Sequence, residues 1–211
     1  MEPREPRADA PRIAVFARAP VPGAVKTRLI ALLGDKGAAA LHATLVERAL
    51  ATATQARPET LQLWCSPDAS HPFFAACAKR FGCELHVQQG SDLGARMAGA
   101  FAAAAPLVLI GSDCPALAAS HLLEAWQALR SHDAAIAPAE DGGYALIALA
   151  RPRPELFERM PWGEAGVMKA TRERLAAAGI RWRELETLWD VDRPDDYERL
   201  QRSGIAPGVR A

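Results

Sequence analysis

Lys26 and Arg28 are two cations at the end of a loop, rich in proline and glycine, behind the first apolar segment of the chain. That segment, residues 13–17 (IAVFA), is typical of a buried parallel strand. Loop N–H groups and the N-terminus of a following helix can point at an anion that the two cations neutralise. The pattern indicates a phosphate site. An ordinary strand–helix turn with a solvated basic tip fits equally well, because neither a Walker loop nor G-x-G-x-x-G is present.

Asp113 follows the clearest apolar segment of the chain, residues 107–110 (LVLI), within the motif GSDCP. A carboxylate that emerges from a buried strand is costly unless a metal, a cation or N–H donors compensate it. We therefore expect Asp113 to bind a cation at the end of this strand. The alternative is an aspartate that shapes a turn or caps a helix before Pro115.

Two further acidic motifs occur later in the chain. Glu140 and Asp141 precede Gly142 and Gly143, and this pair of glycines predicts a tight turn where backbone can approach a ligand closely. Two neighbouring acids near a bound diphosphate would raise the pKa of one of them, as suits a general base. An ordinary hairpin turn is the alternative.

Asp190 and Asp192 alternate around Val191, so their carboxylates would share one face of an extended segment. A helix is expected directly afterwards, and Asp192 could cap its N-terminus as well as contribute to a site.

One cationic loop and three acidic motifs together suit a nucleotide diphosphate bound with Mg²⁺ or Mn²⁺. Such a ligand needs hard oxygen donors for the metal and cations for the remaining phosphate charge. Arg96, in the motif GSDLGARM, is either near this site or on a capped surface helix. The histidines are scattered, no G-x-S-x-G motif is present, and Cys114 has no evident histidine partner, so nucleophilic catalysis has little support.

Composition restricts the class of protein. The 211 residues suffice for one substantial domain, and half of them are apolar, which excludes general disorder. Lys plus Arg and Asp plus Glu both number 25, so the broad basic surface of a nucleic-acid binder is absent. The four cysteines show no zinc or C-x-x-C spacing. No apolar run approaches membrane-spanning length and the N-terminus has no signal-peptide pattern, so we expect a cytoplasmic protein without a membrane span.

Strand and helix patterns alternate along the chain. The expected strands are residues 13–17, 61–65, 84–87, 107–110, 134–137, 144–149 and 182–185, and the expected helices are residues 34–56, 72–81, 92–104, 120–130, 165–178 and 194–201. Asp92 and Ser120 are expected to cap two of these helices. This alternation predicts a mainly parallel sheet with helices on both faces. We expect one domain over residues 13–203, a disordered tail over 1–12 and a loose tail over 204–211.

The motifs, in their order, resemble the DUF2064 family of the nucleotide-diphospho-sugar transferase (GT-A, MobA-like) superfamily. Members of this family are labelled as glycosyltransferases, including the arsenosugar-biosynthesis type. The matching stretches are FARAPVPGAVKTRL, QGSDLGARM, LIGSDCPAL, PAEDGGYALIAL, FERMPW and LWDVDRPDDYERL, which span residues 13–200.

The resemblance implies a GT-A fold with a central mixed sheet. It implies a nucleotide held by the loop after the first strand, here residues 17–28, which includes Ala17, Arg18 and Gly23. It also implies Asp113 as a metal ligand and a catalytic acid at the x-Glu-Asp position, here Glu140 or Asp141. GT-A enzymes often have Asp-x-Asp where this chain has a single carboxylate, so Asp192 is the candidate for the second ligand.

Three functions are compatible with these residues. The first is glycosyl transfer from a nucleotide-diphosphate sugar to a hydroxyl of a small-molecule acceptor, with Asp141 or Glu140 as base. The second is nucleotidyl transfer, in which a phosphorylated small molecule attacks the α-phosphate of an NTP and pyrophosphate leaves. The third, a nucleotide-binding regulatory module without turnover, is the least supported, since four motifs carry catalytic residue types.

Overall fold

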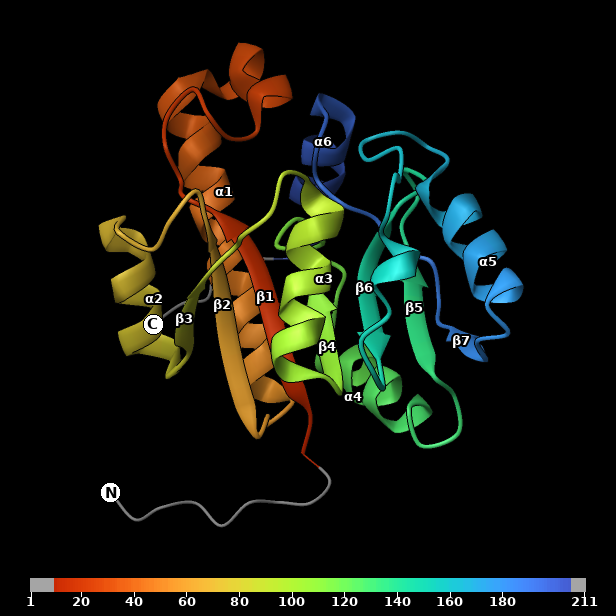
Figure 1. Cartoon of the computed structure of the whole chain (residues 1–211). Coiled ribbons are helices and arrows are strands. Elements are labelled where there is room, and N and C mark those ends of the chain that lie inside the picture. Colours follow the sequence, from red (N-terminus) through yellow and green to blue (C-terminus); the bar gives the residue numbers. More distant parts are fainter. Residues whose placement is uncertain (1–9, 206–211) are drawn as a thin grey trace.

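A seven-stranded sheet with helices on both faces forms the centre of the molecule (Figure 1). The computed structural model describes residues 10–205. The strands are β1 (Arg12–Arg18), β2 (Thr60–Ser66), β3 (Glu84–Val87), β4 (Leu107–Ile110), β5 (Ala134–Pro138), β6 (Tyr144–Leu149) and β7 (Trp182–Glu184), in the spatial order β3-β2-β1-β4-β6-β5-β7. Within residues 10–205, β6 alone runs against its neighbours β4 and β5, and the other pairs are parallel. The predicted mostly parallel sheet is confirmed.

Alternate residues of the strands bury opposite faces of the sheet. Ile13 and Val15 of β1 face one cluster, and Ala14 and Phe16 face the other. Helices α1 (Ile30–Gln55), α2 (Pro72–Phe81) and α4 (Ala119–Ala128) cover the first face, whereas α3 (Leu93–Ala104) and α5 (Val167–Ala177) cover the second. Because both faces are covered, β1 reads as a continuous apolar run rather than an alternating one.

The chain direction brings all the acidic and basic motifs to one edge of the sheet. Strands β1, β4 and β5 point the same way, because β6 is antiparallel to both β4 and β5. The loops that follow β1, β4, β5 and β7 therefore lie at the shared carboxyl edge, where open α/β sheets bind ligands. The 3₁₀ turn η1 (Thr27–Leu29) and α6 (Pro194–Arg202) pack against each other at this edge through Leu29, Val191 and Leu200.

Several predicted boundaries are corrected. Helix α1 begins at Ile30, before Gly34, whose φ of 69° and ψ of 167° interrupt it. Helix α4 begins at Ala119, so Ser120 lies inside it, and the side chain that accepts from the N-cap N–H of Ala118 is Nδ1 of His121, at 2.9 Å. The prediction that Asp92 caps α3 is confirmed, since its Oδ1 accepts from the Ala95 N–H at 2.8 Å.

The predicted tails lie mostly outside the described residues, which exclude 1–9 and 206–211. Within the described part, Arg12 belongs to β1 and pairs with Glu59 at 3.1 Å, so the disordered tail does not extend to residue 12. Ile205 packs against the cluster between α1 and α6, so order also extends past Gly204. The single-domain boundaries remain a prediction, although all seven strands share one sheet.

Residues 27–55 correct the expectation that no segment approaches membrane-spanning length. By length and composition alone, with a mean hydropathy of 1.4, this helical stretch could cross a membrane. In the fold, however, Val46, Ala49 and Leu50 pack it against the sheet, and a core helix of a globular protein meets the same criteria. The packing accounts for the part of its apolar composition that faces the sheet, and the cytoplasmic location remains a prediction.

Candidate active site

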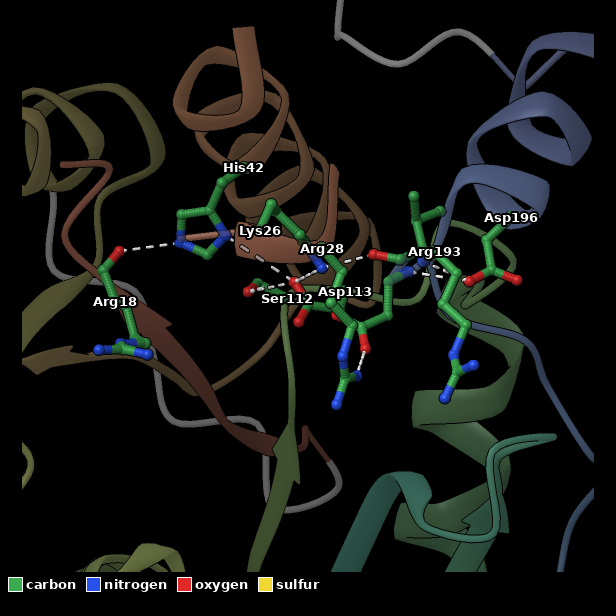
Figure 2. Close-up of polar contacts among 10 residues, drawn as sticks. Arg18, Lys26, Arg28, His42, Ser112, Asp113, Arg193 and Asp196 are labelled. Atoms are coloured by element: carbon green, nitrogen blue, oxygen red, sulfur yellow. Dashed lines mark hydrogen bonds and ion pairs between the residues drawn. The ribbon is translucent and has the colours of Figure 1, made fainter. Parts of the chain in front are cut away.

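Lys26 joins three loops at the carboxyl edge of the sheet (Figure 2). Its side chain is only 3% exposed, and its Nζ donates to Asp113 Oδ1 at 2.9 Å and to the Val191 carbonyl at 2.5 Å. The Val191 N–H in turn donates to the Asp113 carbonyl at 2.9 Å. The backbone of Lys26 is in the left-handed region, with φ of 48°, which is uncommon for a residue other than glycine. Lys26 thus holds Asp113 and the segment around Val191 together, and its predicted contact with phosphate remains a prediction.

Asp113 is ionised and half exposed at the end of β4. Its side chain is 46% exposed, and its Oδ1 also accepts from Ser112 Oγ at 3.3 Å. Burial of the carboxyl is the largest single influence and favours the protonated form. The charges of Lys26 and of protonated His42, together with the hydrogen bonds from Lys26 and Ser112, outweigh it and lower the pKa of Asp113 below its ordinary value. Because Lys26 and Ser112 share Oδ1, Oδ2 is the oxygen left for another ligand.

His42 is a member of the site that sequence reasoning missed. It lies on α1, is 4% exposed, and its Nε2 contacts the Arg18 carbonyl at 3.0 Å while Nδ1 lies 3.8 Å from Asp113 Oδ1. Burial lowers the pKa of His42 although Asp113 opposes this shift, so the ring is neutral near pH 7 and Nε2–H donates to Arg18. In the sequence, a polar ring among the apolar residues of a long helix was the available signal.

A cavity of about 300 Å³ opens beside Asp113, between the ends of β1, β4 and β6 and the start of α3. Its charged lining residues are all acidic: Asp113, Asp141, Glu164 and Asp190. No lysine, arginine or histidine is among its lining residues in the described chain. The rest of the wall is mostly apolar and includes the aromatic rings of Phe16, Tyr144 and Trp162. The structure therefore brings together three predicted motifs around one cavity with an acidic rim.

Asp190, rather than Asp192, lies in this cavity. Burial and, to a smaller extent, the nearby charge of Asp141 raise the pKa of Asp190 to about 6. Asp192 instead forms an ion pair with Arg28. Asp192 is also not the cap of α6, because the Oδ2 of Asp196 accepts from the backbone N–H groups of Asp192 and Arg193, at 3.1 and 2.7 Å. The two alternating acids thus have different partners, and Asp190 is the one that shares the cavity with Asp113.

The two neighbouring acids of the β5–β6 turn are separated by the fold. Oδ1 of Asp141 accepts from the Gly143 N–H at 2.8 Å, and the residue lines the cavity. Glu140 forms a two-bonded ion pair with Arg199, at 2.7 and 3.2 Å, and that guanidinium lies 4.4 Å from the centre of the Trp189 ring. Asp141 is therefore the acid of this turn that borders the first cavity, whereas Glu140 is held by Arg199.

Gly142 makes a close backbone approach to protein, and the expected approach of a ligand to Gly142 and Gly143 remains a prediction. Its φ is 91°, and a Cβ atom there would lie 2.1 Å from the Ala165 carbonyl oxygen. Its own carbonyl accepts from the Met168 N–H at 2.8 Å. Gly142 thus anchors the segment before α5 over the turn, and Gly143 orients Asp141.

The remaining predicted nucleotide-binding residues lie at the same edge but outside the cavity wall. Ala17 is buried, and its carbonyl accepts from Gln88 at 3.3 Å. Arg18 is exposed, and Gly23 makes a turn with φ of 79°. Arg96 contacts the Gly90 carbonyl at 3.3 Å and Ser66 Oγ at 3.5 Å, near the end of β2. Their predicted contacts with a nucleotide remain predictions.

The donor set fits a hard divalent cation held jointly with a ligand. Within residues 10–205, no three His, Cys, Asp or Glu side chains are close enough to form a complete metal site. Mg²⁺, however, is commonly bound by one or two carboxylates with substrate phosphates and water. Asp113 and Asp190 supply two carboxylates on one cavity, and Lys26 keeps Asp113 ionised. The residues therefore suit Mg²⁺ or Mn²⁺ that is completed by phosphate oxygens.

The sequence matches one family profile. The profile of DUF2064, described as "Uncharacterized protein conserved in bacteria", covers residues 49–164. No curated protein matches the chain.

Solved structures share the fold. A protein from Desulfovibrio desulfuricans G20 with the provisional name nucleotide-diphospho-sugar transferase is 34% identical, with a TM-score of 0.82 over 90% of this chain and 86% of its own. Rv0371C from Mycobacterium tuberculosis H37Rv, in complex with manganese, is 22% identical, with a TM-score of 0.55 over 92% and 99% of the two chains. A nucleotidyl transferase from Methanothermobacter thermautotroptrophicus is 16% identical, with a TM-score of 0.61 over 91% and 97%. The last two likenesses concern the fold alone, and the predicted α/β fold class is confirmed.

Proposed function

The chain belongs to the DUF2064 family, and on that premise we propose that it is a metal-dependent transferase that moves a sugar from a nucleotide-diphosphate sugar to an acceptor hydroxyl. The observation that carries the proposal is the convergence of Asp113, Asp141 and Asp190 on one cavity at the carboxyl edge of the sheet. The name of the 34% identical relative, a nucleotide-diphospho-sugar transferase, supports the same class of donor.

Each acid has a distinct role in the proposal. Asp113 and Asp190 would hold Mg²⁺ or Mn²⁺ with the donor diphosphate. When bound, the metal supplies charge neutralisation for the leaving diphosphate. Asp141 would accept the proton of the acceptor hydroxyl, because Gly143 fixes its Oδ1 and leaves Oδ2 for the substrate. The loop over residues 17–28 and Arg96 would contact the rest of the nucleotide.

The acidic wall of the cavity favours a hydroxyl acceptor over a phosphorylated one. A phosphate monoester carries about 1.5 to 2 negative charges at pH 7. Apart from the metal held by Asp113 and Asp190, it would face Asp141 and Glu164 and no cationic side chain on the wall. A neutral hydroxyl compound avoids this repulsion and can donate hydrogen bonds to the carboxylates. The aromatic rings of Tyr144 and Trp162 offer it apolar contact.

Nucleotidyl transfer is the second candidate. The likeness of fold to a nucleotidyl transferase and the cation Arg28 on the first loop favour it. In that reaction, a phosphorylated molecule attacks the α-phosphate of an NTP and pyrophosphate is released.

One incubation experiment separates the candidates. The protein is mixed with Mn²⁺ and either a panel of NDP-sugars with hydroxyl acceptors or a panel of NTPs with sugar phosphates, and free NDP and pyrophosphate are measured. We expect NDP release that depends on acceptor and metal and falls in Asp113→Asn. Pyrophosphate release would establish the second candidate instead. Tight nucleotide binding without release of either product would favour the third function, a nucleotide-binding regulatory module without turnover.

A further inference from the structure

A second cavity, of about 360 Å³, adjoins the first at the start of α6. The two cavities share Asp141, Gly163 and Asp190 on their walls. Unlike the first cavity, the second has two arginines on its wall, Arg28 and Arg193. A ligand that extends past Asp190 would therefore contact the first cavity, whose wall has no cation, and the second cavity, whose wall has two arginines.

Protein groups already engage the carboxylates of this second cavity. Glu140 is paired with Arg199, and Asp192 with Arg28. Asp196 accepts two backbone N–H groups, and Asp141 accepts one. Asp190 lies on the wall that the two cavities share.

Arg193 is the exception among these charges. Its side chain has no hydrogen bond or ion pair with any residue of the described range 10–205, although it lies on the cavity wall. Figure 2 shows the guanidinium groups of Arg28 and Arg193 extending to the same side of the Asp113 cluster. The fold thus presents an exposed, unpaired planar cation to a concave surface beside a second arginine.

Lys26 does not fill this role, because its ammonium group is 3% exposed and donates to Asp113 and Val191. On the wall of the second cavity, the cations among the described residues are Arg28 and Arg193. Arginine binds phosphate oxygens through two parallel N–H groups, and such charge-assisted bonds are about twice as strong as neutral ones.

We propose that Arg193, together with Arg28, binds the diphosphate of the nucleotide in the second cavity. The inference rests on the proposed function for the identity of the ligand. Asp190 borders both cavities. A donor whose diphosphate lies in the second cavity can therefore place the sugar attached to it in the first. The sequence motif DVDRPDD thus contributes a phosphate-binding cation directly after its two aspartates.

Binding measurements test the proposal. Arg193→Gln is compared with wild type and with Arg202→Gln. Arg193 precedes α6, and the control residue Arg202 ends the same helix, with a side chain that is 75% exposed and faces Glu198. Titration calorimetry with Mn²⁺ uses ADP, GDP, CDP and UDP, their nucleosides and inorganic pyrophosphate. We expect Arg193→Gln to weaken binding of the preferred NDP and of pyrophosphate by roughly tenfold or more. Nucleoside affinity and the Arg202→Gln control should stay unchanged, and Arg193→Lys should lose less.

Two outcomes would overturn the inference. One is NDP affinity in Arg193→Gln equal to that of wild type, and the other is an equal loss for NDP and nucleoside. The proposed function fails separately: pyrophosphate binding that depends on Arg193, without NDP release from any NDP-sugar, would keep the phosphate site and remove glycosyl transfer. Circular dichroism of each variant confirms that the fold is retained, as expected for an exposed side chain without partners.

Discussion

Replacing Lys26 with methionine tests whether this residue holds the site together. The substitution keeps a long side chain and removes the ammonium group that donates to Asp113 and Val191. Removing one partner of a fully buried ion pair costs about 3–5 kcal/mol. Asp113 is 46% exposed and can regain water, which reduces this cost, whereas the Val191 carbonyl belongs to a fully buried residue and loses its donor at about 1–3 kcal/mol. We expect a loss of about 2–3 kcal/mol in the free energy of unfolding.

The pH dependence of this loss has a definite sign. Lys26 lowers the pKa of Asp113 in the folded state, so its contribution is present above the ordinary carboxyl pKa and is lost as the pH falls through the folded-state pKa. Lys26→Met should therefore be most destabilising near pH 7, and its effect should shrink in acid. Urea unfolding at several pH values measures the loss of free energy. In thermal unfolding at pH 7, we expect the melting temperature to fall by about 4–12 °C.

The matched control is Lys36→Met, at an exposed lysine on α1, which should change stability by no more than about 0.5 kcal/mol. A double-mutant cycle with Asp113→Asn should show a smaller cost of Lys26→Met once the carboxylate charge is gone. The reasoning is refuted if Lys26→Met folds with wild-type stability but loses NDP affinity selectively, because Lys26 would then serve the ligand and not Asp113.

Three further predictions concern the cavity. Asp141→Asn should keep NDP affinity and lower turnover by about 10²–10⁴-fold, as for a lost general base, and near-wild-type kcat would remove Asp141 from that role. The pKa of Asp190 is raised to about 6, so ionisation of this carboxyl lowers the free energy of unfolding as the pH rises from about 4 to 6. Urea unfolding without metal should therefore show Asp190→Asn to be more stable than wild type at pH 7.5, by at most about 3 kcal/mol, and equally stable near pH 4. Gly142→Ala should lower the free energy of unfolding by about 3 kcal/mol or more, because its Cβ would lie 2.1 Å from the Ala165 carbonyl oxygen. The control Gly111→Ala, at a glycine with open space around it, should have a small effect on stability. Equal melting temperatures of the two variants would contradict this packing.

Local sequence patterns predicted the bounds of helices and strands well where proline, glycine or turn residues mark the ends of the element. Helix α2 begins at Pro72 and ends before Gly82 in both the prediction and the structure, since proline suits a first turn and glycine the left-handed position after a helix. Strands β3, β4 and β6 have the predicted bounds. For β4 and β6 the reason is that a short apolar run between turn residues leaves few alternatives. Where such residues do not mark the start of a helix, the predicted start was wrong by a few residues: α1 begins before Gly34, and α4 begins one residue before Ser120.

The motifs of the site were also visible in the sequence, since carboxylates and cations directly after apolar strands must meet at one edge of a parallel sheet. Asp113 and Asp141 indeed line one cavity. Their partners were not visible. Whether a cation faces a ligand or a protein carboxylate depends on contacts between loops far apart in the chain, and neither spacing nor residue type records those contacts.

The sequence by itself determined the family, the alternation of strands and helices, and which residue types reach the carboxyl edge. Only the tertiary structure decided how the charges are shared: Lys26 points inward to Asp113, Asp192 pairs with Arg28, and Arg193 is left on a cavity wall. The physical reason is that secondary structure follows from local sterics and periodicity, whereas the partner of a charge depends on which loops the fold brings together. A buried ammonium group must find an oxygen within about 3 Å, and the folded loops alone determine which oxygen that is.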